Sequence, residues 1–171
     1  PSRARQALTS AELAPSNEAT WTELTDPARR PPSLGRPVPD AALAFQPAAP
    51  LQLDLDRFFV ALRSARKGTA GGPSGTKSQH LKPLLENEAS MALLGFAATQ
   101  LANARVPETV ATAVALCRMT ALRKPNGRVR GIATGDVFRR LVTRALAQQF
   151  AQELSTATSP FQFALSTRAG T

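Results

Sequence analysis

The sequence has a single cysteine, Cys117, and a single histidine, His80. One thiol cannot form an internal disulfide, and one Cys with one His cannot make a structural zinc site. We therefore expect Cys117 to be a half-buried strand residue, and His80 to cap or flank a helix start rather than to act in catalysis. Reducing conditions are the default for such a chain, so we expect an intracellular protein, nuclear or cytoplasmic and not secreted.

Long apolar stretches are also missing. No run reaches the roughly eighteen apolar residues of a transmembrane helix, so we expect no membrane partner. The N-terminus has neither an initiator Met nor the apolar region of a signal peptide, and we expect it to lie inside a longer chain. The 171 residues, of which 43% are hydrophobic, suffice for one globular domain with a real core.

Acidic residues are scarce in the last third of the chain. Residues 115–171 hold nine Lys and Arg against two acids, residues 51–114 hold seven against five, and residues 1–50 hold five against five. The formal net charge of +9 is thus concentrated after residue 114. Such a basic field favours polyanions, most often nucleic acid, although a solvated face in an Arg-rich protein is the alternative.

The first 50 residues differ in character from the rest. They are rich in Pro and Ala without sustained periodicity, and we expect a mostly disordered linker. Asp54 then predicts the cap of a helix with one apolar stripe. Two more helices are expected at residues 78–87 and 88–105, and a long one after Asp136.

An Asn-Gly pair at residues 126–127 separates two segments that mix apolar and cationic residues. This pair is the strongest short-range signal for a hairpin and predicts a type I′ turn, with positive φ at both central residues. We expect strands at residues 113–122 and 128–133, so that the hairpin spans about 113–134. The cations near its tip are candidates for binding phosphates: Lys124, Arg128 and Arg130.

The long helix after Asp136 carries arginines opposite its apolar face, which predicts either a groove for a phosphate backbone or a solvated face. The candidate nucleic-acid-binding residues are Arg123, Arg139, Arg140 and Arg144. The only acids after residue 114 are Asp136 and Glu153, four to five helical turns apart, which cannot share a pair of metal ions. We therefore expect no catalytic and no metal-binding residue here.

The Gly-rich segment at residues 68–78 is similar at first sight to a phosphate-binding P-loop. Thr76, however, stands between Gly75 and Lys77, and a helix rather than a buried strand precedes the segment. The spacing nearly excludes nucleotide hydrolysis at this loop. We expect a flexible connection instead.

From about residue 67 onward the chain resembles the front part of a reverse transcriptase of the non-LTR (LINE-like) retrotransposon class. Residues 67–75 are similar to its K-x-x-G-P-D/S-G loop, and residues 105–108 resemble its x-I/V-P-x-x-W/L step. Residues 122–132 are similar to its K-P-x-G-x-x-R-P-I hairpin, and residues 136–141 resemble the following helix. Residues 161–171 are similar to its Q-F/Y-G-x-x-x-G-x-G/S-T motif. Gly131 replaces the family's usual Pro and Ala164 its usual Gly.

The resemblance implies an RNA-directed DNA polymerase, a nucleotidyltransferase of right-hand architecture whose fingers bind the template and the incoming dNTP. Residues 51–171 would form a partial reverse transcriptase domain, the fingers and the start of the palm. The fold class expected is α+β, mainly helical, with one antiparallel hairpin flanked by helices. Lys124 and Arg130 would match basic fingers positions that contact the triphosphate.

The implied partners are an RNA template, a DNA primer, dNTP, and the palm and thumb of the same polypeptide. Mg²⁺ is the cofactor expected of the parent enzyme. Because the family's catalytic aspartates follow the motif at residues 161–171, we expect this chain to bind no Mg²⁺ and to be inactive alone. The alternative is a non-catalytic basic nucleic-acid-binding module, or a decayed remnant of such an enzyme.

Overall fold

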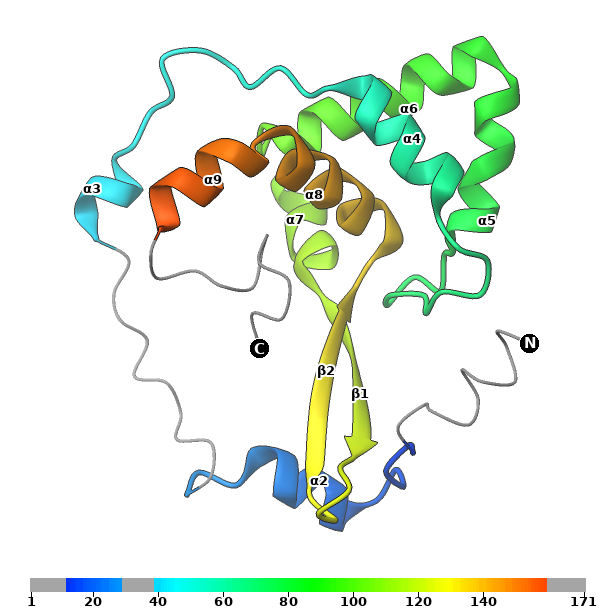
Figure 1. Cartoon of the computed structure of the whole chain (residues 1–171), viewed down its shortest axis with the longest axis vertical. Helices are drawn as coiled ribbons and strands as arrows, with labels where there is room; N and C mark the ends of the chain where they lie inside the picture. The colour runs from blue at the N-terminus through cyan, green and yellow to red at the C-terminus, as the bar shows by residue number, and fades with distance from the viewer. Residues whose placement is uncertain (1–11, 29–38, 160–171) are drawn as a thin grey trace. The chain divides into compact units, whose positions relative to one another are not determined.

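The computed structural model describes residues 12–28 and 39–159. The motif at residues 161–171 therefore lies outside the described residues. The chain divides into two compact units, one made of Pro1–Ala48 with Cys117–Thr134, the other of Ala49–Leu116 with Gly135–Thr171. We call them the hairpin unit and the helical unit. Figure 1 labels their elements, which form a mixed, mainly helical α+β structure with one two-stranded antiparallel sheet. This confirms the expected class at that level.

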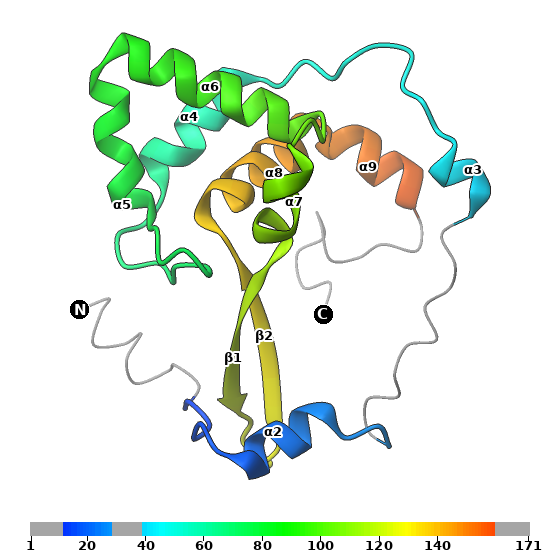
Figure 2. The ribbon, with the colours of Figure 1, turned by 180° about the vertical axis from the view of Figure 1, so that it is seen from behind.

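Three helices build the core of the helical unit: α4 (Leu55–Ser64), α6 (Glu88–Ala102) and α8 (Val137–Gln149). Figures 1 and 2 show them side by side from opposite directions. Phe58 is fully buried, and its ring packs edge-on against Phe59 and Phe138, with centroids 5.4 and 6.0 Å away. The predicted apolar faces of α4 and α8 are confirmed. The buried core consists of Leu53, Phe58, Phe59, Ala61, Leu62, Leu94, Ala98, Val137, Leu141, Val142 and Ala145.

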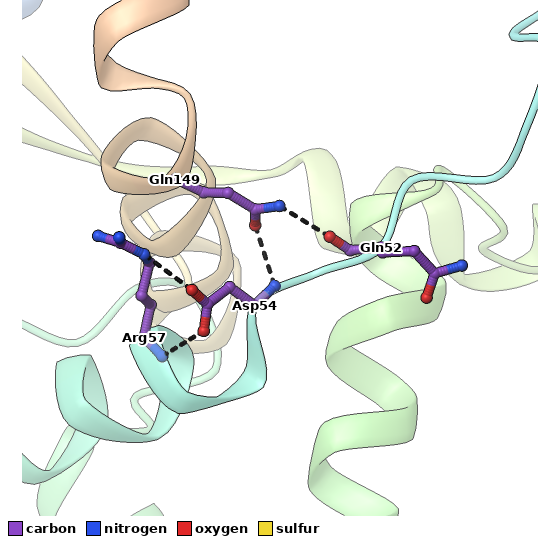
Figure 3. A network of polar contacts seen from close by, with 4 residues as sticks. All are labelled: Gln52, Asp54, Arg57 and Gln149. Atoms are coloured by element: carbon purple, nitrogen blue, oxygen red, sulfur yellow. Dashed lines mark hydrogen bonds and ion pairs between the residues drawn. The ribbon is translucent and has the colours of Figure 1, made fainter.

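Polar side chains fix the start of α4. Asp54 caps the helix as predicted, because its Oδ1 accepts the Arg57 backbone N–H at 2.9 Å while its Oδ2 pairs with Arg57 Nε at 2.8 Å. The backbone N–H of Arg57, a donor to the ionised form, lowers the pKa of the Asp54 carboxyl below its ordinary 3.8. Figure 3 shows that Gln149, the last residue of α8, reaches the same place. Its amide accepts from the Asp54 N–H at 2.9 Å and donates to the Gln52 carbonyl at 2.8 Å, so the end of α8 holds the start of α4.

The remaining helices of the unit are shorter. They are α5 (Ser78–Leu81), the 3₁₀ helix η1 (Lys82–Glu86), α7 (Glu108–Ala115) and α9 (Ala151–Thr158). His80 Nδ1 accepts the Lys77 backbone N–H at 3.3 Å, which confirms its expected place at a helix start. The expected helix at 78–87 is instead α5 followed by η1, where Pro83 has no N–H for an α-helical bond. The helix predicted at 88–105 ends at Ala102, since Ala104 adopts a positive φ of 55°.

The hairpin unit contains β1 (Cys117–Arg123), α2 (Glu18–Thr25), α3 (Asp40–Leu43) and all but the last residue of β2 (Val129–Gly135). The predicted hairpin is confirmed, but its first strand was placed too early. Residues 113–115 belong to α7, and the strand begins only at Cys117, whose side chain is exposed rather than half-buried. Pro107 precedes a run of Ala and Val that is compatible with either a helix or a strand, and Glu108 favours the helix by standing in its first turn.

Part of the expected linker contributes to this unit. Residues 12–14 pair with the free edge of β1 through Ala14 N–H to Ala121 C=O at 3.0 Å and Arg123 N–H to Glu12 C=O at 2.7 Å. Helix α2 follows them, capped by Asn17 Oδ1 at 3.0 Å from the Thr20 N–H. Across the described ranges 12–28 and 39–159, none of the helices combines the length and the apolarity that a membrane crossing needs.

Candidate nucleic-acid interface

The tip of the hairpin is a fixed turn. Lys124 N–H donates to Arg128 C=O at 2.7 Å, and Gly127 N–H donates to Lys124 C=O at 2.9 Å. Gly127 has a φ of +75°, whereas Ala104 is the only non-glycine residue with a positive φ in the described chain. The predicted type I′ turn is therefore wrong. Pro125 and Asn126 form a turn closed by a left-handed glycine, which suits Pro125 because its ring excludes positive φ.

One face of the hairpin is covered by α2. Glu23 Oε1 accepts the Val129 backbone N–H at 2.8 Å. A Cβ atom on Gly131 would meet Met119 Sδ at 2.9 Å and Leu24 Cδ2 at 3.2 Å. Glycine at this position, where the resembling family usually has Pro, therefore allows α2 and β1 to approach β2 closely.

The cations of the hairpin are exposed. Its residues 117–134 include no acid, and their five cations are Arg118, Arg123, Lys124, Arg128 and Arg130. Arg123 Nε lies 3.8 Å from Glu12 Oε2, in an exposed ion pair that contributes little stability. Because side chains alternate along a strand, Arg130 and Ile132 lie on the face opposite Val129 and Gly131, away from α2.

Sequence reasoning missed one cation of this surface. The hydrogen bond from Lys124 N–H to Arg128 C=O sets the strand register, in which residue 118 lies opposite residue 134. Arg118 consequently shares its face with Arg130, not with the residues that contact α2. The period-2 alternation of β1 was the signal that could have identified it. The face opposite α2 thus presents at least two arginines, with Lys124 and Arg128 at its end.

In the helical unit, the three candidate arginines of α8 differ in their hydrogen-bond partners. Arg139 Nη1 donates to Ala115 C=O, at the end of α7, at 3.0 Å. Arg140 Nη2 donates to Ala70 C=O, in the Gly-rich segment, at 2.5 Å. Arg144, one turn further along α8, is exposed. Arg139 and Arg140 are thus partly engaged by backbone carbonyls and partly exposed.

The Gly-rich segment is packed against the start of α8 and is not a loose connection. A Cβ atom on Gly72 would lie 2.5 Å from the Cα and 2.6 Å from the N of Asp136, so only glycine permits this approach. Ser74 Oγ donates to Asp136 Oδ2, and Asp136 Oδ1 accepts the Phe138 N–H at 3.3 Å. Asp136 is therefore the predicted N-cap of α8, and it also holds the segment in place.

Metal-ligating side chains do not gather in the described part of the chain. Within residues 12–28 and 39–159, no three His, Cys, Asp or Glu side chains gather closely enough to hold a metal ion. The described residues therefore do not offer the carboxylate set of a two-magnesium site, and we derive no catalytic step through Mg²⁺. What the cations can do chemically is bind anions and neutralise their charge.

Comparison of the chain with protein-family models, with curated proteins and with solved structures finds no match to any of them.

Proposed function

We propose that the chain is the fingers portion of a reverse-transcriptase-like polymerase, whose hairpin binds the phosphates of an RNA template and of the incoming dNTP. The observation that carries the proposal is the composition of the hairpin, five cations and no acid in residues 117–134. The order of the sequence motifs supplies the polymerase assignment. The same proposal places the protein inside the cell, where it would act on nucleic acid in the nucleus or the cytoplasm.

The turn supports this function physically. Two backbone hydrogen bonds and the left-handed Gly127 fix the tip, so the backbones of Lys124 and Arg128 are already ordered before a ligand arrives. A rigid carrier lowers the entropy cost of binding, because only the side chains remain to be immobilised. Helix α2 covers the opposite face and adds stiffness to a two-stranded ribbon that would be marginal alone.

Salt-dependent RNA binding tests the hairpin. The variant with Arg128→Ala and Arg130→Ala loses two cations, and each phosphate contact on a single strand contributes about 0.7 to the slope of log K against log salt. We expect the slope, measured by fluorescence anisotropy with a labelled single-stranded RNA, to fall by about 1.4. The matched control carries Arg63→Ala and Arg105→Ala, which remove two exposed cations of the helical unit. Equal slopes for wild type and the hairpin variant would exclude the hairpin as the contact.

A non-catalytic basic module is the second candidate, favoured by the lack of a carboxylate cluster in the described residues. Nucleotide binding separates the two. Polymerase fingers bind the triphosphate of a dNTP, and Lys124→Ala or Arg130→Ala should weaken that binding. A non-catalytic module binds RNA but shows no preference for a triphosphate over a monophosphate. Neither candidate predicts primer extension by the chain alone, so templated incorporation of dNTP would contradict both.

A further inference from the structure

The helical unit contains a cavity of about 500 Å³ next to the end of α4, the segment that follows it, and α8. This volume falls within the range of small-molecule sites, about 300–1,000 Å³. Carboxylates are absent from its lining. The polar lining consists of three arginines and three hydroxyl residues: Arg66, Arg140, Arg144, Ser64, Thr69 and Ser78.

One N–H group of Arg140 has no hydrogen-bond acceptor in the described part of the chain. Its Nη2 is bonded to Ala70 C=O, which fixes the guanidinium. Its Nε is buried and has no hydrogen-bond partner among the described residues. A buried N–H without an acceptor costs free energy, and native structures usually satisfy it. Because Arg140 lines the cavity, an oxyanion bound there would lie beside the same guanidinium group.

The lining of the cavity offers no carboxylate to offset the charge of its arginines. Arg66 and Arg144 are exposed, and in the described chain neither belongs to an ion pair. Arg140 and Arg144 are four residues apart on α8, so they share one side of that helix. The negative end of α4 does not cancel this field, since Lys82 Nζ donates to Arg63 C=O at 2.8 Å and to Ala65 C=O at 3.0 Å.

The hydroxyl groups of the lining are further hydrogen-bond donors, and their present hydrogen bonds are weak. Ser78 is 1% exposed, and its Oγ lies 3.4 Å from Arg66 C=O. Thr69 Oγ1 contacts the same carbonyl at 3.4 Å. Both distances are longer than the roughly 2.5–3.0 Å of ordinary O–H···O hydrogen bonds, so either hydroxyl can turn to a better acceptor.

The geometry points to an oxyanion site, in which this cavity binds a phosphate group from a nucleotide or from a nucleic-acid backbone. Arg66, Arg140 and Arg144 supply charge-assisted donors, and Ser78 and Thr69 supply neutral ones. Phosphate fits better than a carboxylate, because three guanidinium groups present more donors than two carboxylate oxygens accept. The site is formed within the helical unit, and it stands whether or not the hairpin binds nucleic acid.

The test follows the Arg Nε–H resonances of the whole chain by NMR while inorganic phosphate, a nucleoside monophosphate or a short single-stranded RNA replaces chloride at constant ionic strength. The Arg140 resonance is identified by its absence in Arg140→Gln. We expect it to shift, and we expect Arg66→Gln or Arg144→Gln to weaken binding about tenfold, the scale of one charge-assisted hydrogen bond. Both side chains are exposed, so these variants should keep the fold.

Arg105→Gln is the matched control, an exposed arginine of the same unit away from the cavity, and it should bind as the wild type does. Equal affinity for inorganic phosphate and the monophosphate assigns free phosphate as the source, tighter binding of the monophosphate assigns a nucleotide, and binding of RNA alone assigns a backbone phosphate. An unmoved Arg140 resonance with all three ligands overturns the inference, as does equal binding by Arg144→Gln and Arg105→Gln. The variant with Arg128→Ala and Arg130→Ala should leave this binding unchanged, which separates it from the hairpin.

Discussion

Gly72→Ala should destabilise the helical unit although the backbone there suits any residue. The new Cβ would meet three backbone atoms, at 2.5 and 2.6 Å on Asp136 and at 2.7 Å on Gly135. Backbone cannot move aside as a side-chain end can, so the Gly-rich segment must shift away from α8. Overpacking of this kind costs about 1–3 kcal/mol. A shift that breaks the bond between Arg140 and Ala70 adds about 1 kcal/mol. We therefore expect a loss of about 2–4 kcal/mol and a fall in Tm of roughly 5–15 °C.

Urea unfolding followed by far-UV circular dichroism measures the effect, because most of the helical residues belong to this unit. Gly68→Ala is the matched control in the same segment. Gly68 has a φ of +78° and open space where its Cβ would be, so it should lose only about 1 kcal/mol through backbone strain. A Gly72→Ala variant as stable as Gly68→Ala or more so would refute the close approach of the segment to α8.

Three further changes have defined outcomes. Gln149→Ala removes two hydrogen bonds of about 0.5–1.5 kcal/mol each, so thermal unfolding should show a loss of about 1–3 kcal/mol, and an unchanged Tm would contradict the contacts drawn in Figure 3. Asp54→Asn keeps a good cap but no charge. Since the folded-state pKa of Asp54 is lowered, its contribution is present above pH 3.8 and lost as the pH falls through the folded-state value, so the variant should show a flatter decline of stability in acid. Phe58→Ala opens the centre of the core and should cost about 3–5 kcal/mol, measured by urea unfolding, and a smaller loss would mean that the site collapses around the missing ring.

Local signals were sufficient for much of the fold. Asp54 and Asp136 precede apolar periodic segments and cap helices as their positions predict. The Asn-Gly pair located the hairpin because few backbone conformations other than a tight turn suit this pair. It did not give the turn type, since Pro125 at the preceding position decided which residues take the central places. The run of Ala and Val before Cys117 is compatible with the periodicity of a helix and with that of a strand, and only its packing in the folded chain decides for a helix.

Contacts between segments that are far apart in the sequence could not be predicted from it. Nothing local shows that Gly72 lies against Asp136, because the requirement for glycine comes from backbone more than sixty residues away in the sequence. Helix α2 lacked a periodic apolar face, and one of its links to the hairpin is a carboxylate bonded to the N–H of Val129. The arginines of α8 were recognisable as cations, but the chain gave no sign that Arg139 and Arg140 bind different carbonyls.

Helix α8 is held at both of its ends, and this bears on how its arginines work. Gln149 ties its last turn to α4, while Asp136 and the Gly-rich segment hold its first turn, where Arg140 is bonded to Ala70. Of these two anchors, only the one at the first turn lies at the cavity lined by Arg66, Arg140 and Arg144. The variants Gly72→Ala and Gln149→Ala disturb one anchor each at a similar expected cost in stability, so their phosphate binding can be compared. Gly72→Ala should weaken phosphate binding because it displaces the carbonyl that positions Arg140, whereas Gln149→Ala should leave it unchanged. Titration by NMR at a temperature where both variants are folded measures this difference. Equal weakening by the two variants would mean that general loosening of the unit, and not the position of Arg140, controls the site.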